Sequence, residues 1–200
     1  MLSGLLATAS LYGQSKGMPP RTTPGDYQAH AQAGTFTIGA EYTGHSIPDP
    51  QTVLSTEDYV VIEVGLFGPP DAHLNLSYEN FSLRINGKKT ALPAQEFVNV
   101  FKSLKNPEYE PPTKSEAKTK TNVNGGGGGG ADANALPPVV HIPIEVERAM
   151  QQKVRNISLP EGDRALPAAG LIFFEHRGKA NSIELIYNGP AGKASMSLQP

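Results

Sequence analysis

Histidine, serine and acidic residues are the side chains of this chain that could carry out catalysis or bind a metal. The five histidines stand at least fifteen positions apart, at His30, His45, His73, His141 and His176. No local ligand pair exists, so a zinc-type site would have to assemble in space, from His45, His141 and His176 near strand ends. The simpler expectation is solvated histidines in loops and on strand faces.

Serine and carboxylate chemistry is equally hard to place. A serine nucleophile needs a histidine base and an acidic partner. His45, Asp58 and a choice of serines could supply such a set, but the sequence specifies no pairing among them. Glu57 and Asp58 precede a predicted strand, in which neighbouring side chains point to opposite faces. We expect them to be solvated charges, and a hydrolase is the last of the functions considered.

Six consecutive glycines at 125–130 form the clearest low-complexity motif. A phosphate-binding loop would continue into Gly-Lys-Ser/Thr between a strand and a helix, whereas Ala131, Asp132 and Ala133 follow here. The run therefore indicates a linker. No catalytic, cofactor-binding or metal-binding residue is assigned from the sequence, and no cofactor is expected.

The overall composition narrows the choice of partner. Seventeen Lys and Arg against 19 Asp and Glu leave a net charge of −2, so a general attraction to nucleic acid is not expected. The absence of Cys excludes disulfides, thiolate zinc sites and cysteine nucleophiles. With 38% hydrophobic residues, the chain is expected to hold one globular domain by its core alone.

The first 33 residues are expected to lie outside the domain. Residues 2–11 form an apolar stretch too short to span a membrane. Ala7 and Ala9 have the spacing that a signal peptidase accepts, although no basic segment precedes them. We interpret this stretch as the remnant of a signal peptide whose true start lies upstream, with a buried N-terminal helix as the alternative. The residues after it are predicted to be a flexible lead-in, and the protein is expected to be secreted or periplasmic.

Alternation of apolar and polar side chains predicts strands from residue 34 onward. Phe36, Ile38, Ala40 and Tyr42 alternate with polar and small residues, which is typical of a strand with one face in water. A central strand is predicted at 59–67, with Val60, Ile62, Val64 and Leu66 on one face and Val61, Glu63 and Gly65 on the other. Further strands are predicted at 81–85 and, as the return strand after an Asn86-Gly87 turn, at 88–92.

Two helices and one insertion interrupt the strands. Apolar residues at i, i+3, i+4 and i+7 predict a short helix within 95–105. A second helix is predicted over 144–156, with Pro143 in its first turn and Arg155 near its end. Residues 107–138 contain few large aliphatic side chains and cannot offset the roughly 1–2 kcal/mol per residue that ordering a backbone costs. We therefore expect a disordered insertion in a single domain at 34–200.

The end of the chain predicts a three-stranded meander over 171–177, 182–187 and 194–198. Its first strand contains the adjacent pair Phe173-Phe174, whose side chains must point to opposite sides. We expect one side to be covered by the sheet and the other by a helix, and the alternative is an exposed apolar patch that docks a partner. Six to seven short strands without βαβ alternation predict an antiparallel β-sandwich.

A family resemblance follows from several of these segments. Leu159 to Gly162, Ala169 to Phe174 and Ile183 to Tyr187, together with the strand at 59–67 and residues 81–83, resemble the bacterial telokin-like, immunoglobulin-type domains of unknown function. The likeness covers about residues 34–105 and 139–198. It implies an exported immunoglobulin-like β-sandwich and supplies no catalytic residue.

The sequence therefore leads to a non-enzymatic, exported β-sandwich that mediates contact with another envelope or extracellular protein. A small-ligand or glycan-binding module is the alternative. Trp is absent and most Phe and Tyr are predicted to face inward, which leaves few stacking surfaces for a sugar. Neither nucleic acid binding nor a membrane span is expected.

Overall fold

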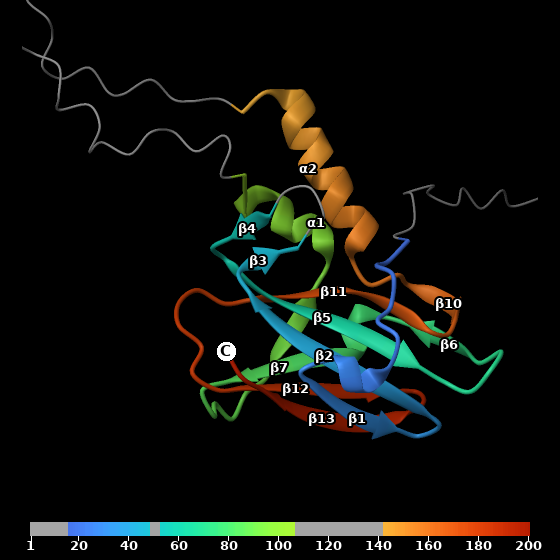
Figure 1. Cartoon of the computed structure of the whole chain (residues 1–200). Coiled ribbons are helices and arrows are strands. Elements are labelled where there is room, and N and C mark those ends of the chain that lie inside the picture. Colours follow the sequence, from blue (N-terminus) through green and yellow to red (C-terminus); the bar gives the residue numbers. More distant parts are fainter. Residues whose placement is uncertain (1–15, 49–52, 107–141) are drawn as a thin grey trace, which may run out of the picture.

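The computed structural model describes residues 16–48, 53–106 and 142–200, and about half of these residues lie in β-strands. Eight strands form one antiparallel sheet in the order β1-β2-β5-β11-β8-β7-β12-β13. The sheet curls until its edge strands β1 and β13 lie against each other (Figure 1). Across this seam, Gln28 Nε2 donates a hydrogen bond to the Gln199 carbonyl at 2.7 Å. The sheet is therefore a nearly closed barrel.

The barrel strands are β1 (Ala29–Ala33), β2 (Phe36–Gly44), β5 (Tyr59–Phe67), β7 (Phe81–Ile85), β8 (Leu92–Gln95), β11 (Ala168–Glu175), β12 (Ile183–Gly189) and β13 (Gly192–Leu198). Two small sheets lie outside it: β3 (Ser46–Ile47) with β4 (Leu54–Thr56) and β9 (Leu104–Lys105), and β6 (His73–Leu76) with β10 (Gly162–Ala165). The helices are α1 (Phe97–Val100) and α2 (Ile144–Ile157), with short 3-10 turns at Pro24–Asp26, Tyr78–Asn80 and Phe101–Ser103.

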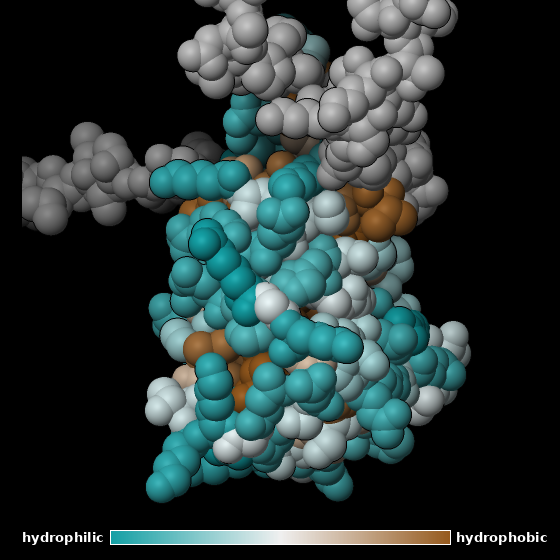
Figure 2. Space-filling model, turned by 90° about the vertical axis from the view of Figure 1, so that its left-hand side faces the viewer, coloured by the Kyte–Doolittle hydropathy of each residue, from teal (hydrophilic) through white to brown (hydrophobic). Residues whose placement is uncertain are grey.

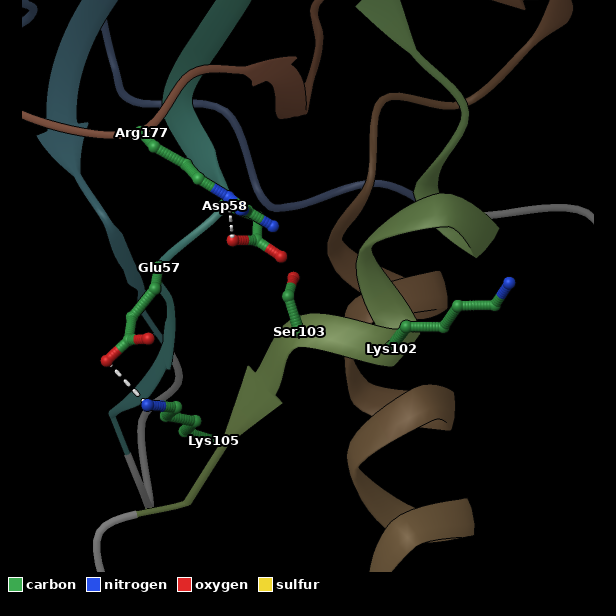
Figure 3. A pocket seen from close by; sticks show the side chains of 6 residues that line it. All are labelled: Glu57, Asp58, Lys102, Ser103, Lys105 and Arg177. Carbon is green, nitrogen blue, oxygen red and sulfur yellow. Dashed lines mark hydrogen bonds and ion pairs between the residues drawn. The ribbon is translucent and has the colours of Figure 1, made fainter.

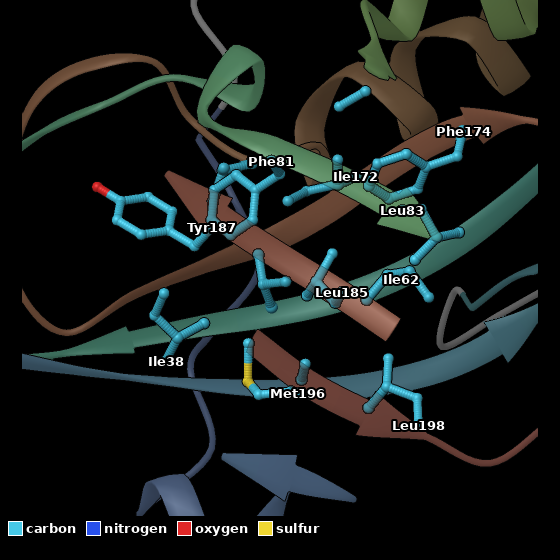
Figure 4. Packing of buried hydrophobic residues seen from close by; sticks show 14 of the residues in the cluster. Ile38, Ile62, Phe81, Leu83, Ile172, Phe174, Leu185, Tyr187, Met196 and Leu198 are labelled. Carbon is cyan, nitrogen blue, oxygen red and sulfur yellow. The ribbon is translucent and has the colours of Figure 1, made fainter. Parts of the chain in front are cut away.

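The barrel interior is filled by the inward-facing side chains of its strands. Alternate residues of each strand point inward because the side-chain period of a strand is two. The ring of Tyr187 packs against Phe36 and Phe81, with centroid distances of 5.5 and 5.0 Å. Other members of this core are Ile38, Ile62, Leu83, Ile172, Phe174, Leu185, Met196 and Leu198 (Figure 4).

A second, smaller core covers the outer side of β5 and β11. Phe173 lies in it, whereas Phe174 lies in the barrel interior. The prediction that the two adjacent phenylalanines are buried on opposite sides is therefore confirmed. Helix α2 contributes Met150 and Val154 to this core, one helical turn apart on the same face.

The elements around the second core form one end of the molecule, which we call the cap. The cap comprises α1, the 3-10 turn at Phe101–Ser103, α2 and the β3-β4-β9 sheet, and it lies at the top of Figure 1. Helix α2 begins after Pro143, whose carbonyl accepts the N–H groups of Val146 and Glu147 at 2.9 and 3.0 Å. The predicted helix at 144–156 is thus confirmed, because the apolar stripe and the N-terminal proline both act locally.

Residues 16–28, which we call the strap, lie across the outer face of β2 and β5. Tyr27 is only 4% exposed, and residues 29–33 form β1. The flexible lead-in expected at these positions is therefore wrong for residues 16–33. The expectation that the strand at Phe36 to Tyr42 has one face in water is also wrong, because the strap covers the outward face of this strand.

The predicted return strand at 88–92 is also wrong. The Asn86-Gly87 turn forms, with φ of 54° and 67°, and the Lys88 N–H donates to the Ile85 carbonyl at 3.2 Å. The Asn86 side chain is bound elsewhere, however, because its Oδ1 accepts the N–H groups of Asn181 and Ser182 ahead of β12. Pairing back onto β7 starts only at Leu92, which lies opposite Leu83.

The predicted meander holds for β12 and β13, which pair along their length, but β11 does not join it. β11 pairs instead with β5 and β8. Its two apolar faces suit a position that is covered on both sides, inside the barrel wall and under the cap. The helix expected within 95–105 is shorter than predicted, because the chain passes from α1 through a 3-10 turn into β9.

The predicted mainly β, antiparallel architecture with one or two short helices is confirmed, but the strands do not separate into the two facing sheets expected of a sandwich. None of the helices in the described ranges combines the length and the apolar character needed to cross a membrane. The apolar stretch at 2–11 and the insertion expected at 107–138 lie outside the described residues.

Candidate functional site

A hollow of about 540 Å³ lies beside the cap and is lined by charged and polar side chains. Four segments meet there: the bend between β4 and β5, the 3-10 turn after α1, strand β9, and the loop after β11 (Figure 3). We call it the charged hollow, and its lining residues are Glu57, Asp58, Lys102, Ser103, Lys105 and Arg177.

Glu57 and Asp58 both line this hollow, although strand alternation predicts that they point apart. They lie in a bend between two strands, where the alternation does not apply. Each carboxylate is ion-paired: Lys105 Nζ lies 2.5 Å from Glu57 Oε1, and Arg177 Nε lies 2.6 Å from Asp58 Oδ1. The hydrogen bond that Arg177 donates to Asp58 raises the pKa of Arg177. Both residues are predicted to be solvated charges. Glu57 is exposed, as predicted, whereas Asp58 is half-buried.

Ser103 and His45 are hydrogen-bonded in ways that do not form a serine relay. Ser103 Oγ donates to the Val100 carbonyl at 3.0 Å and lies 2.7 Å from Thr56 Oγ1. His45 Nδ1 lies 3.0 and 2.8 Å from the carbonyls of Thr56 and Tyr59, so this nitrogen carries the proton. In the predicted set of a serine, a histidine and an acid, His45 is therefore hydrogen-bonded to two carbonyls, and Asp58 is ion-paired with Arg177.

The other histidines that the structure describes are His30, His73 and His176. His30 is exposed on β1, and His73 Nδ1 lies 3.3 Å from Asp163 Oδ2. Burial, with the nearby charges of Lys88 and His45, lowers the pKa of His176. Among the described residues, no three His, Asp or Glu side chains are grouped closely enough to hold a metal. His141, the third member of the predicted combination, lies outside the described residues.

A second hollow, of about 480 Å³, adjoins the first through Arg177, which lines both. Its other lining residues come from β8 and the end of β11, namely Leu92, Pro93, Gln95, Glu175 and His176. The lining of the two hollows contains no Phe, Tyr or Trp. A stacking platform for sugar rings is therefore not part of either hollow.

A further serine motif, Gly13-Gln-Ser-Lys-Gly17, has the Gly-x-Ser-x-Gly pattern of a nucleophile elbow. Its serine lies outside the described residues, and the residues 18–22 that follow it are not helical. A nucleophile elbow leads from a strand directly into a helix. The described part of this motif therefore has the wrong context for an elbow.

The structure also brings together four residues that the sequence analysis leaves unconnected: Arg21 and Tyr27 of the strap, and Glu41 and Glu63 of the barrel wall. A signal was present, because Gly39 and Glu41, like Gly65 and Glu63, fall on the outward side of their strands. What the strand pattern lacked was any sign of the segment that covers them.

Comparisons with known proteins yield no relative: no family model, no curated protein and no solved structure matches this chain.

Proposed function

We propose that this chain is a non-enzymatic, exported contact domain that binds another envelope or extracellular protein through its cap and the charged hollow. The observation that carries the proposal is that the cap bears exposed aliphatic side chains and also supplies Lys102, Ser103 and Lys105 to the charged hollow. Val53, Val98 and Ile144 are 56%, 38% and 54% exposed, and all lie on or beside elements of the cap. Protein interfaces commonly combine such apolar contacts with a polar rim.

The charges of the hollow support recognition of a protein surface. Two acidic and three basic side chains line it, and the Lys105–Glu57 and Arg177–Asp58 pairs bridge its segments. Exposed pairs of this kind contribute little to stability, but they steer association and fix the register of a partner. The face at the left of Figure 1 is mostly hydrophilic with separate apolar patches between the polar side chains (Figure 2).

A catalytic role has less support from the same contacts. The Ser103 hydroxyl donates to the Val100 carbonyl, and Asp58 accepts from Arg177, so neither is poised beside a histidine base. A glycan-binding role lacks aromatic stacking surfaces in either hollow. Recognition of protein is therefore the function we favour.

Export and the family resemblance belong to the same proposal. Export is supported by the apolar stretch at residues 2–11 and its small residues. The likeness to telokin-like, immunoglobulin-type domains rests on the sequence segments at 59–67, 81–83, 159–162, 169–174 and 183–187. A member of that family with a known structure would support the resemblance only if its strands had the same order as those of this barrel.

Affinity purification from an envelope extract tests the proposal with matched variants. The wild-type chain is expected to retain a protein partner, and Ile144→Asp to weaken retention by about tenfold or more, because a charge in an apolar contact is costly to bury. Arg177→Glu should also reduce retention by reversing a rim charge. Lys193→Glu on β13, away from the cap, is the control and should retain the partner fully.

Equal retention by all four proteins would contradict a contact through the cap. Retention of the wild type on a polysaccharide column, without any protein partner, would favour the glycan-binding alternative.

A further inference from the structure

The outer wall of the barrel carries two glycines and two carboxylates where β2 and β5 pair. Gly39 lies directly opposite Gly65, and Glu41 directly opposite Glu63. We call these four residues the docking face. Two facing glycines leave a smooth floor, and two facing carboxylates stand beside it.

The strap presents one ring and one guanidinium to this face. A Cβ at Gly39 would lie 2.4 Å from Tyr27 Cδ2, and one at Gly65 would lie 2.3 Å from Tyr27 Oη. The Tyr27 ring thus occupies the space that side chains at both positions would fill. Phe67, two residues further along β5, meets the same ring edge-on at 6.0 Å.

Arg21 is bound through all three of its guanidinium nitrogens. Nε and Nη2 donate to the two oxygens of Glu63, each at 3.1 Å, and Nη1 donates to Glu41 Oε2 at 2.8 Å. Nη1 also donates to the Asp26 carbonyl at 2.6 Å, and the guanidinium lies 4.6 Å from the centre of the Tyr27 ring. The fork geometry matches arginine and not lysine.

A segment that covers the docking face must bring a cation. Like charges that are directly opposite on neighbouring strands repel each other, and Glu63 is only 7% exposed while the strap covers it. A carboxylate that is covered without a partner is strongly destabilising. If the strap leaves, another guanidinium is the group that restores the same contacts.

The strap is held mainly by side chains and not by a β-ladder. Its backbone contacts to the barrel include the hydrogen bonds from the Met18 N–H to the Ala169 carbonyl at 2.8 Å and from the Gln28 N–H to Glu41 Oε2 at 3.1 Å. Recognition therefore depends on an arginine and an aromatic ring, which a different chain could present equally well.

We propose that the docking face is a binding site for an extended segment of a separate partner protein that presents an arginine and a tyrosine, and that the strap fills this site in the free protein. A second copy of this chain fits less well as the source, because only Gln28 separates Tyr27 from β1, which leaves no linker for an exchange. This inference goes beyond the proposed function, since the docking face lies on the barrel wall and not on the cap.

The test uses the full chain with the strap weakened and a synthetic peptide of residues 16–28 supplied in trans. The Arg21→Ala/Tyr27→Ala variant should bind the labelled peptide at least about tenfold more tightly than the wild-type chain, whose own strap competes at millimolar effective concentration. Adding Gly65→Ala should abolish binding, because the new Cβ blocks the ring. A peptide with Arg21→Ala should bind at least about tenfold more weakly.

A control variant and a folding measurement accompany this binding experiment. Gly25→Ala adds a Cβ 3.7 Å from Thr23 Oγ1, an ordinary contact, and should leave competition by the strap unchanged. If the double variant does not fold alone, the peptide should restore its cooperative thermal transition, because a ligand of the native state stabilises it. Absence of both binding and rescue would overturn the proposal, as would binding that Gly65→Ala leaves intact. A wild-type dimer that Gly65→Ala abolishes would assign the site to a second copy and overturn the choice of partner.

Discussion

The burial and the partners of single residues in the barrel wall cannot always be predicted from the strand pattern. Glu63 lies on the second face of the predicted strand at 59–67, together with Val61 and Gly65, and the structure shows it to be a buried carboxylate. It is tolerated because Arg21 donates two hydrogen bonds to it. Nothing near Glu63 in the sequence indicates this partner, because the two residues are 42 positions apart.

Removing the Glu63 charge should cost more stability than removing an exposed one. Glu63→Gln is expected to lose about 1–3 kcal/mol of unfolding free energy, because it leaves Arg21 short of its partner in a partly buried site. The Arg21 side chain is 32% exposed, which screens the pair and keeps the loss below that of a fully buried one. Urea unfolding at constant m-value measures it.

The matched control is Glu184→Gln on β12, whose partner Arg84 and own side chain are each about a third exposed. Its expected loss is below about 1 kcal/mol. Equal losses at the two sites would show that the burial of Glu63 does not strengthen its pair.

A second prediction at this scale concerns pH. Burial, with the charges of Glu96 and Glu79 nearby, raises the pKa of Glu161 above its ordinary 4.5. The folded state thus binds this proton more tightly than the unfolded chain, so the stabilisation is complete below the unfolded pKa and is lost as pH rises through the folded value. Glu161→Gln should therefore be more stable than wild type at about pH 7 and equal to it at about pH 3.

Urea midpoints of the two proteins across this pH range measure the difference. An offset of the same size at both ends would mean that the amide changes packing and that the carboxylate charge is not the cause.

At the scale of elements, the clearest agreement between sequence and structure is α2. Its stripe of Val146, Met150, Val154 and Ile157 is a local pattern, and the helix forms where predicted. Its exposed N-terminal part extends beyond the barrel, while Met150 and Val154 hold its C-terminal part against the second core (Figure 1). Most of the stability of such a helix comes from this contact and not from its intrinsic propensity.

Weakening that contact should loosen the helix selectively. Val154→Ala removes two methyl groups from a fully buried position and is expected to cost about 1.5–3 kcal/mol. Amide exchange should then accelerate along Ile144–Ile157, with little change in β12 and β13.

Val98→Ala is the control for this experiment, because Val98 on α1 is 38% exposed and its truncation should cost under about 1 kcal/mol. Uniform acceleration across the barrel in Val154→Ala would show instead that α2 and the barrel open as one unit.

For the whole molecule, the two halves of the chain are interleaved in one sheet. β11 lies between β5 and β8, and β12 lies between β7 and β13. The strands before residue 107 and those after residue 141 therefore complete each other's hydrogen bonds and share one interior. Neither half could form the eight-stranded sheet without the other.

A single cut between residues 107 and 138 should accordingly leave one particle. The two fragments are expected to elute together in native size-exclusion chromatography and to separate only in concentrated urea, because separation would break the β5–β11 and β7–β12 pairings. A specific protease site engineered into that segment makes the cut. Separate elution under native conditions would indicate two independent domains.

Sequence periodicity alone determined the β character of the chain, the strand at 59–67, the burial of Phe173 and Phe174, and helix α2. These features are set by neighbours two to four residues apart, where side-chain direction follows from backbone geometry. The Asn86-Gly87 turn belongs to the same group, although its return strand does not. The predicted function and location stay predictions.

Only the tertiary structure decided the strand order, the closure of the sheet into a barrel, the charged hollow and the strap on the docking face. Each depends on pairs far apart in sequence, such as Arg21 with Glu63 and Asp58 with Arg177. Such pairs form only after the sheet has curled and set its register, and their charges leave no periodic trace in the chain. The charged hollow and the contacts of the strap could therefore be identified only from the tertiary structure.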